Sequence, residues 1–140
     1  MTDFVTAECG IRQLHGRYAD AIWRQDSAAF AKCWTQDAVW KISGREAHGR
    51  AEIAALFEAS VEASERVMMW IGVPVLDVGV GAATGRVQVT ELIKRKTGEA
   101  VRTLALYYDH YREDAGHWRF AKRHFNLYYF GPPDLSADIY

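Results

Sequence analysis

Cysteine is scarce in this chain of 140 residues, and its positive and negative charges almost cancel. The two cysteines, Cys9 and Cys33, lack the CxxC spacing of a metal or redox site and are too few to cross-link a small secreted fold. We therefore expect two reduced, buried thiols in a cytoplasmic protein. A formal net charge of -1, with acids and bases distributed along the chain, offers no electrostatic footprint for nucleic acid or for an anionic membrane.

Long hydrophobic runs are also missing. No window approaches the ~18 apolar residues of a membrane span, and residues 1–8 lack the basic start and apolar stretch of a signal peptide. Neither an HExxH motif nor a compact ligand cluster is formed by the histidines, which are His15, His48, His110, His117 and His124. Glycine-rich phosphate loops and G-x-S-x-G are absent too. The sequence therefore predicts no metal, no cofactor and no membrane contact.

Helical patterns are present in the first half of the chain. Apolar residues recur at spacings of three and four from Ile11 to Ile22, which predicts an amphipathic helix. Asp26 and Ser27 form an N-cap signal ahead of a short second helix. Good helix formers with helical spacing from Ile53 to Val61 predict a third helix.

β-branched and aromatic residues dominate after Glu65, and glycine turns recur at regular intervals. Four strands are predicted there, Val67–Val78, Arg86–Lys96, Ala100–Arg112 and His117–Phe130, after a short earlier strand, Val39–Ile42. Gly72 and Pro74 mark a bulge or an edge in the first of the four. Three helices and an antiparallel meander predict one α+β domain over residues 1–140, with a pocket at the wide end of a bent sheet.

Aromatic residues are abundant, at 13%, and include five tryptophans. The strings RYADAI, AFAKCWTQDAVW and HGRAEIAALF, and later YYDHYREDAGHWRFAKR, resemble the SnoaL-like branch of the NTF2-like superfamily. The resemblance covers nearly the whole chain and implies a cone-shaped fold, in which three N-terminal helices pack on a curved antiparallel sheet around one ligand cavity. It also implies a homodimer or homotrimer, because relatives associate through the exposed face of the sheet.

The resemblance predicts a catalytic residue at two positions of the sequence. Scytalone dehydratase and hexachlorocyclohexane dehydrochlorinase, two members of the branch with similar patterns, are cofactor-free lyases that use a His-Asp pair as base. Alignment places the family's aspartate at Trp23 and its histidine at Trp70, so the pair is missing. Other pocket positions of the family correspond to Tyr18, Trp40 and Arg123. The implied cavity is an aromatic box, lined by these five residues, with one cation.

Each of these residues has a second explanation. The three tryptophans of the box, like Trp34 and Trp118, are also expected as core residues; for the last two we favour the core. Arg123 shares a strand face with Ala121 and Phe125, so a concave face would bury it and require an anionic partner. That partner is either a bound carboxylate, phenolate or enolate, or an internal acid such as Glu91 or Asp109.

The sequence does not identify the residue that transfers the proton. Tyr18 either donates a hydrogen bond to a ligand oxygen or only fastens the first helix to the sheet. Tyr107, Asp109 and Tyr111 share one strand face, while Tyr108 and His110 share the other, and the sequence does not choose between the faces. We therefore expect a replacement base among Asp20, Asp109 and His110.

Two functions follow from these observations. The first is a cofactor-independent lyase, dehydratase or isomerase that holds a small aromatic or polycyclic substrate against Trp23, Trp40 and Trp70. The second is a non-catalytic binding or scaffold module for a hydrophobic acid or phenol. They differ in one observable: the enzyme requires a titratable side chain, besides Arg123 and Tyr18, that faces the cavity.

Overall fold

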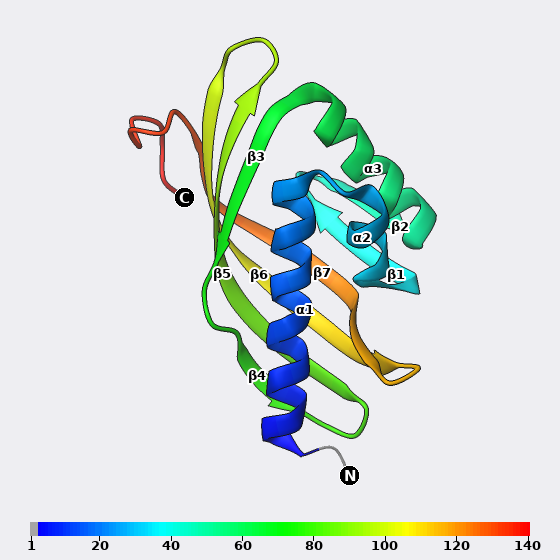
Figure 1. Ribbon diagram of the computed structural model, residues 1–140. Helices are drawn as coiled ribbons and strands as arrows, with labels where there is room; N and C mark the ends of the chain where they lie inside the picture. Colours follow the sequence, from blue (N-terminus) through cyan, green and yellow to red (C-terminus); the bar gives the residue numbers. More distant parts are fainter. Residues whose placement is uncertain (1–2) are drawn as a thin grey trace.

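The computed structural model describes residues 3–140, and over these residues the chain forms three helices and seven strands (Figure 1). The helices are α1 (Phe4–Arg24), α2 (Ser27–Lys32) and α3 (Arg50–Ala63). The strands are β1 (Trp34–Ile42), β2 (Arg45–His48), β3 (Ser64–Ile71), β4 (Val75–Val78), β5 (Ala82–Arg95), β6 (Ala100–Asp114) and β7 (His117–Gly131). The predicted α+β class is confirmed.

Side-chain caps define where the first two helices begin. Asp3 accepts a hydrogen bond from the backbone N–H of Thr6 at 3.0 Å, so α1 begins well before the predicted Ile11. Asp26 caps α2 in the same way through the N–H of Ala29, also at 3.0 Å, as its sequence predicts. Both caps satisfy backbone donors that have no partner within the helix.

The strands form a curved, open sheet in the order β2-β1-β7-β6-β5-β3, with β4 also paired to β5. The predicted antiparallel meander is present, but β1 pairs with β7 in parallel, so the sheet is mixed. The physical reason is connectivity: a hairpin makes its strands antiparallel, whereas β1 and β7 are joined through the rest of the domain and are free of that constraint.

The segment predicted as one strand, Val67–Val78, is divided into β3 and β4. Both pieces pair with β5, and the N–H of Gly72 still donates to Gln88 O at 2.9 Å. Pro74 has no N–H to contribute, which fits the break at this point. The short strand β2, which the sequence pattern does not predict, lies between Gly44 and Gly49 and pairs with β1.

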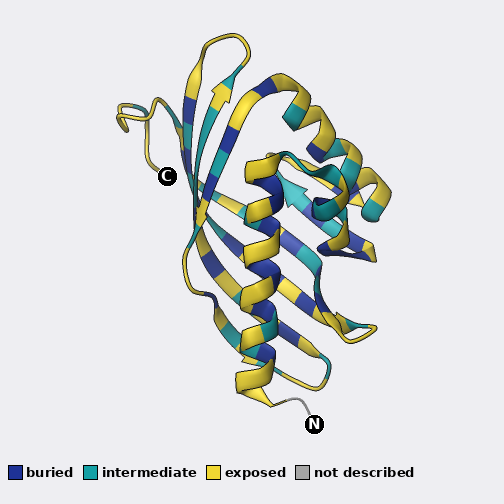
Figure 2. Cartoon of the chain, viewed as in Figure 1, coloured by how far each residue is buried: buried dark blue, intermediate teal, exposed yellow. Residues whose placement is uncertain are grey.

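The helices cover one face of the sheet, and the core lies between the two layers (Figures 1 and 2). Trp34 and Trp118 are buried there, as expected. Cys33 is buried too, but Cys9 is exposed, contrary to expectation, because it lies on the side of α1 away from the sheet. Within residues 3–140, no helix is long and apolar enough to cross a membrane.

Candidate functional site

A cavity of about 150 Å³ lies between the helices and the inner face of the sheet. Its wall is mostly aromatic and aliphatic. The aromatic side chains are Tyr18, Phe30, Trp40, Phe57, Tyr107, Phe125 and Phe130. Four polar side chains complete the wall: Ser43, Ser60, Glu91 and Thr103. Helices supply one side of this wall and the inner faces of the strands supply the other.

Arg123 lies behind this wall and is paired inside the protein. It stands directly opposite Asp109 in the β6–β7 register, and its side chain is 1% exposed. Arg123 Nε donates to Asp109 Oδ1 at 2.7 Å, and Nη2 donates to Oδ2 at 3.1 Å. This two-pronged geometry is the strong form of an arginine–carboxylate pair. The two partners considered for Arg123 were a bound anion and an internal acid. The structure shows the internal acid, Asp109.

Aromatic rings surround the Arg123 guanidinium. Its central carbon lies 3.6 Å from the ring centroid of Tyr107, 4.2 Å from that of Phe120 and 4.6 Å from that of Tyr18. Burial by itself lowers the pKa of Arg123, but Asp109, Tyr18 and Tyr107 together outweigh burial and the pKa is raised. Arg123 is therefore charged, and it contacts the rings of Tyr18 and Tyr107, which line the cavity.

A hydrogen-bond chain extends from Asp109 to helix α1. The Tyr111 hydroxyl donates to Asp109 Oδ2 at 3.1 Å, and Tyr111 is in turn 2.8 Å from His15 Nε2. Because the ionised Asp109 can only accept, Tyr111 donates its hydroxyl proton to Asp109, and the Tyr111 oxygen accepts a hydrogen bond from His15 Nε2–H. Burial, and then the charge of Arg123, lower the pKa of His15 well below its usual value, so His15 is neutral.

Two tyrosine hydroxyls meet the cavity. The Tyr107 oxygen accepts a hydrogen bond from Trp40 Nε1 at 3.1 Å, and the hydroxyls of Tyr18 and Tyr107 are close enough to interact with each other. Burial raises the pKa of Tyr107 to about 12 and that of Tyr18 well above 10. Both phenols therefore keep their protons at neutral pH, and Tyr107 has one to donate.

Glu91 is the acid that faces the cavity. It lies on β5, half-buried, and within the described chain its carboxyl has one hydrogen bond, from Thr103 Oγ1 at 3.1 Å. Burial raises the pKa of Glu91, against smaller opposing effects of Thr103 and Arg123. Sequence reasoning considered Glu91 only as a partner for Arg123. A signal was present, since Glu91 continues the period-2 row of Val87 and Val89 on the inner face.

The other expected acids and bases lie outside the cavity. Asp20 is exposed on α1 and pairs with Arg24 at 3.0 Å. His110 is exposed on the outer face of β6, because its neighbour Asp109 occupies the inner face and successive side chains alternate. Asp109 is on the inner face but is engaged by Arg123.

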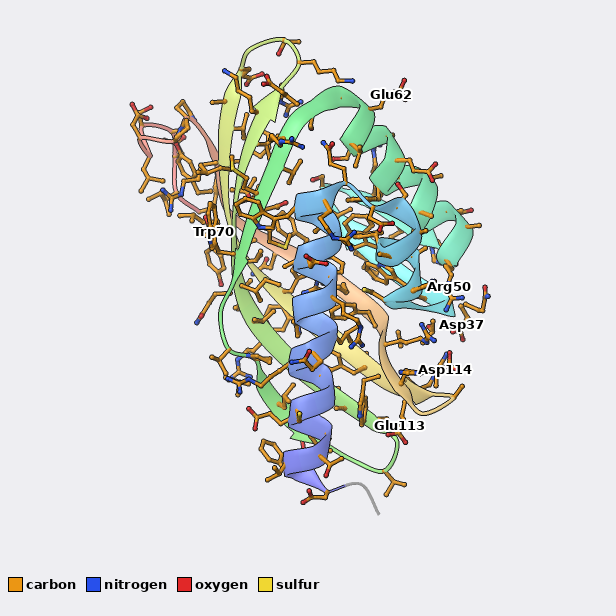
Figure 3. The ribbon with its side chains drawn as sticks, viewed as in Figure 1. Asp37, Arg50, Glu62, Trp70, Glu113 and Asp114 are labelled. Carbon is orange, nitrogen blue, oxygen red and sulfur yellow. The ribbon has the colours of Figure 1, made fainter. Side chains whose placement is uncertain are left out.

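Trp23 and Trp70 also lie outside the cavity. They contact each other edge to face, with ring centroids 5.5 Å apart, and are 41% and 48% exposed. Trp23 Nε1 donates to Met69 O at 2.9 Å. Met69, which precedes Trp70 on β3, has the inward position, and Trp70 lies on the outer side of the sheet (Figure 3). Of the expected aromatic box, the cavity wall contains Tyr18 and Trp40.

No set of three histidine, cysteine or acidic side chains within residues 3–140 is arranged to hold a metal ion. The site therefore consists of an apolar cavity, one carboxyl group, two phenol groups and an ion pair behind the wall.

Solved structures share this architecture. A candidate aromatic ring hydroxylase from Novosphingobium aromaticivorans is 20% identical, with 97% of this chain and 100% of that chain covered and a TM-score of 0.87. A hexachlorocyclohexane dehydrochlorinase of type 2 is 19% identical over 97% and 94% of the two chains, with a TM-score of 0.83. A candidate scytalone dehydratase from Novosphingobium aromaticivorans is 14% identical over 96% and 97%, with a TM-score of 0.85.

At these identities the structures establish the fold and nothing finer. No curated protein matches the sequence. The family comparison is more specific, because the SnoaL-like domain matches residues 4–124, from the start of α1 into β7. With the fold, the cavity and this match in agreement, the chain belongs to the SnoaL-like domain family.

Proposed function

We propose that this protein is a cofactor-independent lyase or isomerase that moves a proton on a small aromatic substrate held in the cavity. The observation that carries the proposal is the carboxyl group of Glu91, which lies in an otherwise largely apolar wall. It is the titratable group that the enzyme hypothesis requires. The cofactor-free lyase named among the similar structures, the dehydrochlorinase, supports this class of reaction.

Cavity size limits the substrate. An apolar cavity of about 150 Å³ holds benzene in an engineered protein, whereas sites for drug-sized ligands measure about 300–1,000 Å³. The cavity of this chain, at about 150 Å³, matches the benzene-sized cavity and is smaller than a site for a drug-sized ligand. We therefore propose a substrate with a single ring, which narrows the earlier expectation of a small aromatic or polycyclic compound.

Glu91 and Tyr107 have complementary roles in the proposed reaction. The carboxylate of Glu91 removes a proton from a substrate carbon, and the electron pair left behind moves onto a conjugated oxygen. Tyr107 donates its proton in a hydrogen bond to that oxygen. One such donor contributes about 3–4 kcal/mol to lowering the barrier. An isomerase then returns the proton to another carbon, whereas a lyase expels a leaving group.

The surrounding residues hold these two groups. Trp40 fixes the Tyr107 oxygen, and Thr103 fixes one oxygen of Glu91. The raised pKa of Glu91 moves its titration toward neutral pH, where a general base is most effective. Tyr18 supplies a second phenol at the cavity wall. Asp109 is excluded as base because Arg123 occupies both of its oxygens.

Deuterium exchange tests the proposal without knowledge of the natural product. Single-ring enolisable ketones such as acetophenone are incubated with the protein in D2O, and loss of the C–H signal is followed by NMR. We expect exchange above the buffer rate, reduced about a hundredfold or more in Glu91→Gln. Tyr107→Phe should also reduce it. Glu62→Gln, an exposed acid on α3, is the matched control (Figure 3). Equal rates in wild type and Glu91→Gln would refute the role of Glu91.

A non-catalytic binding or scaffold module is the second candidate. It is favoured by the contact between Trp23 and Trp70 at the positions where the family's catalytic pair is expected. Ligand binding without exchange, in wild type and in Glu91→Gln alike, would support this candidate over the enzyme.

We also propose that the protein forms a homodimer or homotrimer through the outer face of the sheet. Tyr108 and Tyr128 are exposed there, and Trp70, Leu104 and Tyr128 surround a shallow hollow. An open apolar sheet face of this kind is typical of an interface. Light scattering coupled to size-exclusion chromatography gives the mass, and a monomer at micromolar concentration would contradict the proposal.

A further inference from the structure

The charge balance around the cavity restricts what it can bind. Its wall contains no lysine, arginine or histidine among the described residues, and Glu91 is its charged group. Arg123 lies just behind the wall, but the Asp109 carboxylate neutralises it through two hydrogen bonds. Counting these three residues, the local charge is -1 when Glu91 is ionised. A ligand therefore meets one uncompensated negative charge in a low-dielectric site.

An acidic ligand is disfavoured by this arrangement. Two carboxylates that share a buried site cannot both stay ionised without a counter-charge, so either the ligand or Glu91 must take up a proton. The sequence alone left open whether Arg123 needs an anionic ligand or pairs with an internal acid such as Glu91 or Asp109. The pairing of Arg123 with Asp109 removes that need.

A cationic ligand is favoured by the same wall. An ammonium group has three donors, and the acceptors that line the cavity are the Glu91 carboxylate and the hydroxyls of Ser43, Ser60, Thr103, Tyr18 and Tyr107. The aromatic rings add attraction, since cations bind to aromatic π-systems. An aromatic wall that contains one carboxylate therefore matches an organic amine in both shape and charge.

We infer that the cavity selects a single-ring compound with a protonated amine, over a neutral or acidic compound of the same shape. The inference rests on the proposed function, because it assigns the ligand to the same cavity. It goes further by giving Glu91 a role in recognition: the carboxylate that is proposed to act as base also binds the ammonium group. The substrate class is thus a small aromatic amine with a basic nitrogen.

Three probes of nearly identical shape test the inference: benzylamine, benzyl alcohol and benzoate. Binding to the full-length protein is measured by calorimetry at pH 7. Hydrogen bonds to charged groups contribute about 1.5–3 kcal/mol, so we expect benzylamine to bind at least about tenfold more tightly than benzyl alcohol. Benzoate should bind most weakly. Glu91→Gln should weaken benzylamine about tenfold or more and leave benzyl alcohol within about threefold, while Glu62→Gln should change neither.

Several results would overturn the inference. These are failure of benzylamine to bind, binding of benzoate as tight as that of benzylamine, or unchanged benzylamine affinity in Glu91→Gln. The outcomes also separate the inference from the proposed function. Glu91-dependent amine binding with no deuterium exchange on any probe would support the inference and oppose catalysis. Glu91-dependent exchange on neutral ketones, without amine selectivity, would support catalysis and oppose the inference.

Discussion

Arg123 and Asp109 face each other directly across β7 and β6, and their side chains form a two-pronged ion pair that is completely buried. A one-residue slip between the strands would turn one partner to the opposite face of the sheet. The pair therefore specifies the register of the two central strands, and with it the position of Tyr107 in the cavity wall.

Asp109→Asn should destabilise the protein strongly. It leaves the Arg123 charge buried and unpaired, which typically costs about 3–5 kcal/mol. Urea denaturation measures the free energy of unfolding. Asp37→Asn is the control, because Asp37 and Arg112 form an exposed pair and its loss should have little effect (Figure 3). Equal losses in the two variants would show that the buried pair has no special role.

Two glycines of α1 should respond to alanine in opposite directions. At Gly10 an added Cβ would lie 2.5 Å from Cδ1 of the buried Trp118, and such overpacking costs about 1–3 kcal/mol. At Gly16 nothing lies within 4 Å, so alanine should stabilise the helix by about 0.5–1 kcal/mol. Thermal and urea unfolding of Gly10→Ala and Gly16→Ala give the two values. If both variants were more stable than the wild type, α1 and Trp118 would be less closely packed than the structure shows.

Glu91 should make the stability of the protein depend on pH. Burial raises its pKa above the ordinary 4.5 in the folded state, so the folded chain holds this proton more tightly than the unfolded chain. The associated stability is complete below about pH 4.5 and is lost as the pH rises through the raised value. Denaturation between pH 4 and pH 8 should therefore show a shallower decline in Glu91→Gln. Glu62→Gln should retain the wild-type slope, and parallel curves for all three would contradict the assignment.

Trp70→His should not restore the family's chemistry. The side chain at this position lies on the outer side of the sheet, so an imidazole there does not reach the cavity. We expect deuterium exchange to stay at the wild-type rate, and the free energy of unfolding to fall by about 1 kcal/mol through loss of the contact with Trp23. Faster exchange would show that residue 70 has access to the ligand.

Local features of the fold could be predicted from the sequence. The Asp26 cap and the glycine turn between the strands predicted over Arg86–Lys96 and Ala100–Arg112 are signals between neighbouring residues, and the structure confirms both. The parallel pairing of β1 with β7 could not be predicted, because no local pattern links residues so distant in the chain. The sequence also predicted a buried Cys9, whereas Cys9 is exposed in the structure.

The candidate site was harder to predict for the same reason. The alternation of β6 shows which residues share a face, but only packing decides that Asp109 is inside and His110 outside. The partner of Arg123 was one of several open choices, because strand register is a tertiary property. Glu91 was considered only as a partner for Arg123, since the alternation in β5 could not show that its inner face borders a cavity.

The parallel pair of β1 and β7 has a consequence for how the protein is made. Trp34 is paired with Phe120, and the N–H of Phe120 donates to Cys33 O at 2.8 Å. During synthesis α1, α2 and β1 leave the ribosome long before the strand that completes their side of the sheet. Long-range pairing of this kind slows folding and leaves apolar surface exposed in the meantime. The nascent chain therefore cannot close its cavity until β7 has emerged, and until then Trp34 lacks its ring contact with Phe120.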